Sequence, residues 1–278
     1  MSQPWHTRAG LPWALAVGAL ALATVASLAG LLAPDLYRDT ESWTREARAT
    51  DVVTLLFAVP LLAIALWRVR GGSRSARMVV AGALGYVAYS YAIFAFSVAP
   101  NPATPLYLAI LGLSAWALVL GIGRMGDPSA LQEIVSRLPR RGSGIYLIAV
   151  AILFGLLWAS EIAAAVTADG PTETLARAGL PTNPIWALDL AFALPVVAYG
   201  GVRLLRAEAG AAATALPALV FLALIGLAVL GVFAYSALDG EEVVLVPVVL
   251  VSIITLIAAG LVLLAHGIRP PTTPEPRA

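Results

Sequence analysis

Long apolar runs separated by short polar stretches fill most of the chain. A helix needs about 20 mostly apolar residues to cross a hydrocarbon core of about 30 Å. Eight runs meet or approach that length, and the second is the shortest: residues 11–33, 52–67, 78–98, 104–123, 144–168, 184–204, 213–236 and 243–266. The pattern predicts an all-α integral membrane protein with about eight transmembrane helices.

Composition agrees with a membrane protein and excludes several functions. The chain is 60% hydrophobic and 12% charged, against about 45–50% and about 25% in soluble domains. The net charge of +1 is not that of a nucleic-acid-binding domain, so nucleic acid is excluded as a partner. The chain has no cysteine, and its histidines are His6 and His266, too few for a haem or His-rich metal centre. No cofactor is therefore expected.

The arginines predict an orientation. All 17 basic residues are Arg, and a cytoplasmic N-terminus leaves only four of them in outer loops, Arg38, Arg45, Arg48 and Arg177. Such an excess of positive charge is typical of cytoplasmic loops. The outer loops receive most of the acids: Asp35, Asp39, Glu41, Glu46, Asp51, Asp169, Glu173, Asp239, Glu241 and Glu242. We expect a multi-pass protein of the cell membrane, in contact with the lipid bilayer, with both termini cytoplasmic.

Two polar segments have a pattern of their own. Residues 124–143 form an amphipathic cytoplasmic linker in which Asp127 can cap a helix beginning at Pro128. Its apolar face should lie on the membrane, either as a lipid sensor or as a flat linker: Leu131, Ile134, Val135 and Leu138. Residues 34–51 are expected to form a solvated outer cap with a short helix and Trp43 at the membrane interface.

The second and sixth runs resemble each other. FAVPLLAIALWR and FALPVVAYGGVR share five identities at one constant offset: Phe57 with Phe192, Ala58 with Ala193, Pro60 with Pro195, Ala63 with Ala198 and Arg68 with Arg203. The other runs recur at nearly the same offset, which predicts two repeats. Because four spans is an even number, the repeats would be parallel. We predict a first four-helix unit at 1–123, a second at 144–268 and a disordered cytoplasmic tail at 269–278.

Pro60 and Pro195 are then one feature seen twice. A proline inside a helix lacks the N–H that would bond a carbonyl one turn earlier, and it usually bends the helix. In lipid the freed carbonyl needs a partner within the protein. We therefore expect both prolines to face the bundle interior, either as structural bends or as parts of a gate.

Two carboxylates fall inside predicted spans. Asp189 lies about 8 Å and Glu161 about 10 Å below the outer surface at about 1.5 Å per residue, and intramembrane acids normally face the protein interior. Asp189 replaces Thr54 of the first repeat, which favours a specialised site. The two acids should face each other or a shared cavity, with Tyr89 and Trp158 as donors. The candidate ligand or ion site is Glu161, Asp189, Tyr89, Trp158 and Thr54; the alternative is a structural hydrogen-bonded tie.

Several segments resemble recurring motifs of an uncharacterised family of bacterial polytopic membrane proteins. They are LLAPDLYRD, DVVTLLFAVPLL, LGYVAYSYAIFAF and GLPTNPIWALDLAFALPVV, within about residues 31–206. The resemblance implies an integral membrane protein and carries no activity with it.

Three functions are compatible with this pattern. A small transporter or ion-coupled permease, binding a small molecule or ion, is suggested by the duplication, the paired prolines and the intramembrane acids. A non-catalytic membrane subunit or assembly factor, bound to another membrane protein, is suggested by the short loops. An intramembrane enzyme could use paired carboxylates, but the sequence shows no evident nucleophile or metal cage.

The predicted topology can be tested with single cysteines, since the native chain has none. A membrane-impermeant thiol reagent applied to intact cells should label Thr172→Cys and Ala237→Cys and spare Ser75→Cys and Ser136→Cys. The reverse labelling pattern would show that the orientation is inverted.

Overall fold

The computed structural model describes residues 10–122 and 128–267 and is helical, with no strand in those ranges. Eight of its helices are long and apolar enough to cross a membrane. They are Leu11–Leu32, Glu41–Arg70, Arg74–Ser97, Thr104–Ile122, Arg140–Thr167, Pro184–Leu205, Ala212–Leu238 and Leu245–Ala265. The predicted all-α polytopic membrane protein is thereby confirmed. Asp127 and the tail 269–278 lie outside the described residues.

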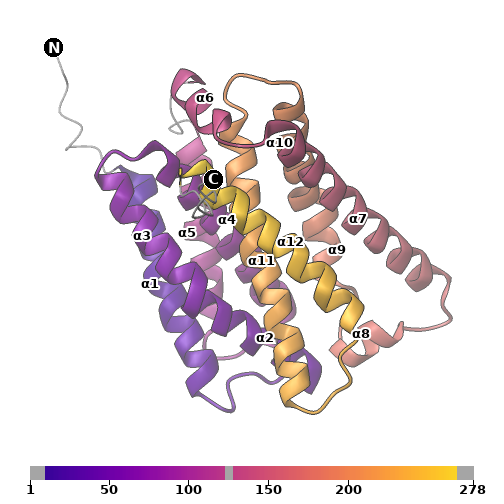
Figure 1. Cartoon of the computed structure of the whole chain (residues 1–278). Helices are drawn as coiled ribbons and strands as arrows, with labels where there is room; N and C mark the ends of the chain where they lie inside the picture. The colour runs from indigo at the N-terminus through magenta and orange to yellow at the C-terminus, as the bar shows by residue number, and fades with distance from the viewer. Residues whose placement is uncertain (1–9, 123–127, 268–278) are drawn as a thin grey trace, which may run out of the picture.

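The spans alternate in direction between two ends of the bundle, named here the α6 end and the α8 end (Figure 1). The first half contains α1 (Leu11–Leu32), α2 (Glu41–Val53), α3 (Val59–Arg70), α4 (Arg74–Ser97) and α5 (Thr104–Ile122). The second half follows α6 (Pro128–Ser136) and contains α7 (Arg140–Thr167), α8 (Glu173–Ala178), α9 (Pro184–Leu188), α10 (Leu194–Leu205), α11 (Ala212–Leu238) and α12 (Leu245–Ala265).

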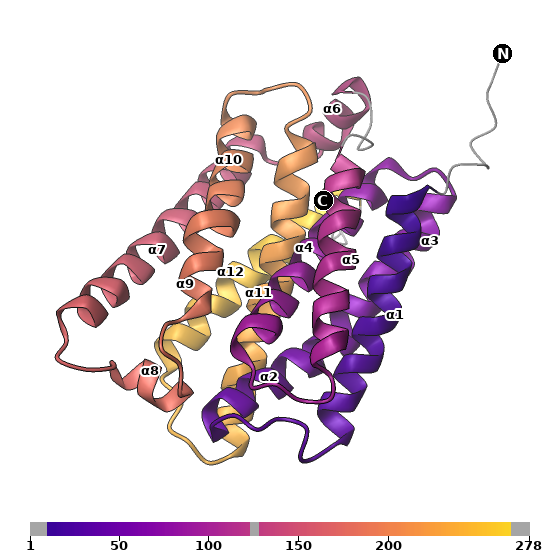
Figure 2. The same ribbon diagram turned by 180° about the vertical axis from the view of Figure 1, so that it is seen from behind.

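Helices α4 and α11 join the two halves. They pack on each other near the middle of the bundle, with the first half on one side and the second on the other (Figure 2). Each half has its own hydrophobic core, and α11 supplies Val220 and Leu224 to the core of the first half. The α4–α11 contact is close because Gly82 has no side chain. A Cβ at Gly82 would lie 2.5 Å from Val220 Cβ and 2.6 Å from the Pro217 carbonyl oxygen.

The second span is longer than its apolar run. It begins at Glu41, where the Thr40 side chain accepts a hydrogen bond from the Trp43 backbone N–H. The polar first turns pack against protein instead of forming a solvated cap, and Arg45 is 8% exposed. Its guanidinium bonds Asp239 at 2.7 Å and Glu241 at 2.6 Å, and the hydrogen bond from Arg45 lowers the pKa of Glu241. These ion pairs fix the α11–α12 loop to α2.

A π-helical turn precedes each repeated proline. Residues Thr54–Ala58 form η2 before Pro60, and Asp189–Ala193 form η3 before Pro195. Each turn ends on a bond spanning five residues, from Val59 N–H to Thr54 O and from Leu194 N–H to Asp189 O. The two turns therefore recur at the same offset as the two prolines. Turns of this kind are rare, and they are frequent at functional sites.

The expected inward direction of the prolines is wrong. Pro60 and Pro195 are both exposed on the outer surface of the bundle. The physical reason lies in the π turn, which inserts extra backbone and rotates the helix face before the proline. The first residues of the turns, Thr54 and Asp189, point inward instead, Thr54 being buried and Asp189 half-buried.

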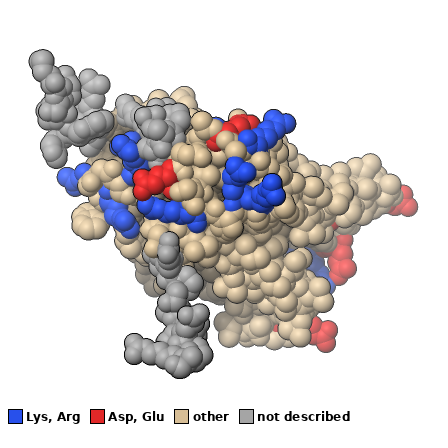
Figure 3. Space-filling model, turned by 45° about the horizontal axis from the view of Figure 1, so that its top comes forward, with Lys and Arg blue, Asp and Glu red and all other residues tan. Residues whose placement is uncertain are grey.

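Helix α6 begins at Pro128 as predicted, but its apolar face packs on protein. Leu131, Ile134, Val135 and Leu138 are 3–5% exposed and join the core of the second half with Met78 of α4 and Ala211. The side chains proposed to enter the membrane are therefore covered by α4 and α11. Arginines gather over this α6 end (Figure 3).

We predict that Gly82→Ala loosens the junction of the two halves. The added methyl group overlaps Val220 and Pro217, and overpacking of this kind lowers stability by about 1–3 kcal/mol. Gly85→Ala is the matched control because its Cβ would lie 3.9 Å from Phe221, in ordinary contact. Unfolding in detergent should show a loss for the first variant and little change for the second; equal stability would contradict the close approach.

Candidate functional site

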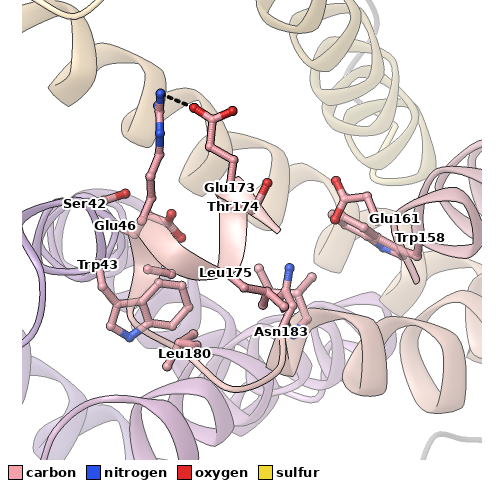
Figure 4. Close-up of a pocket in the computed structure, with 13 residues that line it drawn as sticks. Ser42, Trp43, Glu46, Trp158, Glu161, Glu173, Thr174, Leu175, Leu180 and Asn183 are labelled. Carbon is pink, nitrogen blue, oxygen red and sulfur yellow. Dashed lines mark hydrogen bonds and ion pairs between the residues drawn. The ribbon is translucent and has the colours of Figure 1, made fainter. Parts of the chain in front are cut away.

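Two adjoining cavities lie toward the α8 end. The end cavity, of about 520 Å³, is enclosed by α2, α8 and the facing parts of α7 and α9, and it contains Glu161 and Glu173 (Figure 4). The interhelical cavity, of about 340 Å³, lies deeper between α2, α4, α7, α9, α11 and α12 and contains Asp189. The two share four lining residues: Trp43, Glu46, Trp158 and Ile185.

Asp189 is held by donors from both halves. Its Oδ1 accepts a hydrogen bond from the Tyr89 hydroxyl of α4 at 2.9 Å. Its Oδ2 accepts one from Trp158 Nε1 of α7 at 2.7 Å. These are the two donors that the sequence suggested. The position of Asp189 at the start of η3 places the carboxylate between α4 and α7, so the residue sits where the two halves meet.

Glu161 and Asp189 do not contact each other; each accepts a hydrogen bond from the tryptophan that lies on the other acid's helix. Trp158 and Glu161 are three residues apart on α7, and Trp186 and Asp189 are three residues apart at α9 and the start of η3. Because the two helices are antiparallel, Trp158 reaches Asp189 while Trp186 Nε1 donates to Glu161 Oε2 at 3.0 Å. Asp189 lines the interhelical cavity and Glu161 the adjoining end cavity, so of the two expected arrangements the structure shows neither a direct acid pair nor a single cavity lined by both acids.

Thr54 lies apart from this cluster. It is 1% exposed in the first half, and its hydroxyl is within 3.2 Å of the Tyr86 hydroxyl. Thr54 and Asp189 occupy matching places at the starts of the two π turns. One is sealed in a core and the other faces a cavity, so Thr54 does not join the predicted site.

A third acid is buried in the first half, where the sequence placed an outer loop. Asp51 is 2% exposed and accepts a hydrogen bond from the Tyr37 hydroxyl. Gly30 of α1 makes room for this pair, because a Cβ there would overlap both side chains. Burial raises the pKa of Tyr37, so the phenol keeps its proton and acts as the donor. The bond ties the α1–α2 loop to α2.

Sequence reasoning missed the contribution of α2. Trp43, Glu46, Ala47 and Thr50 line the interhelical cavity at a spacing of i, i+3, i+4 and i+7, which is one face of a helix. That periodicity was present in the sequence, but the charges around it suggested a loop. Within the described residues, no group donates a hydrogen bond to the Glu46 carboxylate, so its oxygens are open to a ligand.

The rest of the interhelical cavity is mainly apolar. Aromatic and aliphatic side chains from α7, α11 and α12 form its wall: Phe154, Leu157, Phe221, Leu250, Val251 and Ile254. An apolar cavity with a few polar groups at one end is typical of a small-molecule site, whose volume is usually about 300–1,000 Å³. The described residues contain no group of three acids or histidines placed to hold a metal ion.

Comparison of the chain with protein families, with curated proteins and with solved structures gives no match.

Proposed function

We propose that this multi-pass membrane protein is a small permease whose ligand site is the interhelical cavity. The observation that carries the proposal is the position of Asp189, an intramembrane carboxylate held by Tyr89 of one half and Trp158 of the other. Charged groups at such depth usually mark a substrate or ion pathway. Transporters built from repeats commonly bind their substrates where the repeats meet.

The two halves are proposed to be parallel repeats. The π turns and their prolines recur at one offset. At that offset α4 corresponds to α11, and these two helices contact each other. Helix α2 packs on α11, and its counterpart α9 packs on α4. Gly82 and Pro217, which touch across the junction, occupy matching positions at the same offset. This reciprocal packing fits a two-fold axis along the membrane normal.

The proposed orientation follows from the arginines. Arg68, Arg70 and Arg74 lie at the α6 end, and Arg140 and Arg141 begin α7 there. The positive-inside tendency then places this end in the cytoplasm. Both cavities would be reached from the outer side in this conformation, and transport requires a second conformation that opens toward the α6 end.

Access to the cavity tests the proposal without knowledge of the ligand. Ser90 lines the interhelical cavity, and Ser90→Cys changes its size little. In sealed vesicles of either orientation, a membrane-impermeant thiol reagent should modify this cysteine from the outer side and, more slowly, from the cytoplasmic side. A proton or ion gradient should change the ratio of the two rates.

Ser114→Cys is the matched control, since Ser114 of α5 is buried as Ser90 is but lines neither cavity and bonds the Ile110 carbonyl at 2.6 Å; it should stay unmodified. Modification of Ser90→Cys from one side alone under every gradient would contradict a permease and favour a static membrane subunit.

A further inference from the structure

The interhelical cavity has an opening toward the side of the bundle. The Tyr146 hydroxyl of α7 donates to the Ile254 carbonyl of α12 at 2.7 Å, and from there the two helices run alongside each other toward the α8 end (Figures 1 and 2). Leu157 on α7 and Leu250 on α12 line the cavity and are also 42% and 40% exposed. The cavity therefore continues between α7 and α12 to the surface that faces lipid.

The first half, as far as the structure describes it, packs differently at the matching place. In the first half, α1 packs along α5. In the second half, α7, which corresponds to α1, packs along α10, and α12 packs on α11. The residues that begin the two π turns differ in the same way. Thr54 is buried in the core of the first half, here called the closed half, and Asp189 lines the cavity of the second, the open half. An opening of this kind admits a molecule that is dissolved in the bilayer.

The polar end of the cavity carries carboxyl groups and aromatic rings. Glu46 and Asp189 line the interhelical cavity, and Glu161 lines the adjoining end cavity. Trp43 and Trp158 stand where the two cavities join. The cation of the end cavity, Arg177, is bonded to Glu173 at 2.7 Å. Carboxylates beside tryptophan rings favour an ammonium group, through charge attraction and cation–π contact.

We propose that the ligand is an amphiphilic cation with a hydrocarbon tail and an amine or quaternary ammonium head, which enters from the bilayer between α7 and α12. The head lies among Glu46, Asp189 and Trp158, and the tail lies along the apolar wall formed by α7, α11 and α12. This inference rests on the proposed function, because it names the substrate class of the same cavity.

Direct binding to the full chain in lipid nanodiscs tests the class. The probe is radiolabelled decyltrimethylammonium, and empty nanodiscs correct for partition into lipid. We expect saturable binding that decyl sulfate and decanol, with the same tail, do not displace. Tetramethylammonium, which has the head alone, should compete at least about tenfold more weakly, a difference of about 1.4 kcal/mol.

Charge-neutral variants test the site. Glu46→Gln removes a carboxylate that holds no hydrogen bond in the described structure, so folding should be unaffected and affinity should fall about tenfold. Asp189→Asn can keep both bonds, because its amide oxygen accepts from Trp158 and its amide nitrogen donates to the Tyr89 hydroxyl; it should lose affinity similarly. Glu242→Gln, an equal change of charge in the exposed α11–α12 loop, should bind as the wild type.

The outcomes separate this inference from the proposed function. Equal displacement by decyl sulfate or decanol, no saturable binding, or unchanged affinity in both Glu46→Gln and Asp189→Asn would each overturn the amphiphilic cation. If Ser90→Cys still showed access from both sides, the permease would stand with another ligand. One-sided access of Ser90→Cys would remove the permease itself.

Discussion

A carboxylate within a hydrocarbon layer must find donors inside the protein, and the arrangement of the second half follows from this constraint at Asp189. Insertion of such a group is unfavourable by about 2.5–3.5 kcal/mol or more. Tyr89 and Trp158 bond its two oxygens, which brings α4, α7 and the η3 turn to one point. The π turn aims Asp189 inward while Pro195, a few residues later, is exposed. Asp189 thus joins the two halves, begins the π turn and lines the cavity.

The two halves use the same elements differently. In the first, the π turn begins with Thr54, a neutral side chain that a single hydroxyl contact with Tyr86 satisfies, and α1 closes against α5. In the second, the corresponding place holds Asp189, and both α7 and α12 line a cavity. In the proposed permease, the closed half would be the scaffold against which the open half moves.

The spans were predictable from the sequence because the hydrocarbon core requires long apolar helices. The hydrogen bonds of Asp189 with its two donors were predictable because few polar groups occur in those spans. The start of the second span at Glu41 was not predictable, because charged residues such as Arg45 and Asp51 are buried by protein contacts that hydropathy does not register. The outward prolines depend on a change of backbone register before Pro60 and Pro195. The separation of Glu161 from Asp189 depends on which tryptophan faces which acid, and depth along the helix does not determine that.

The central claim is that Asp189 bonds a donor from the opposite half, and a double-mutant cycle between Tyr89 and Asp189 tests it most directly. Hydrogen bonds between transmembrane helices contribute about 0.6 kcal/mol on average and up to about 1.7 kcal/mol. Unfolding of the protein in detergent should show that Tyr89→Phe is destabilising by about 1 kcal/mol in the wild type. In the Asp189→Leu background the same change should be neutral or stabilising, because the hydroxyl has lost its acceptor. An equal loss of stability in both backgrounds would contradict the account.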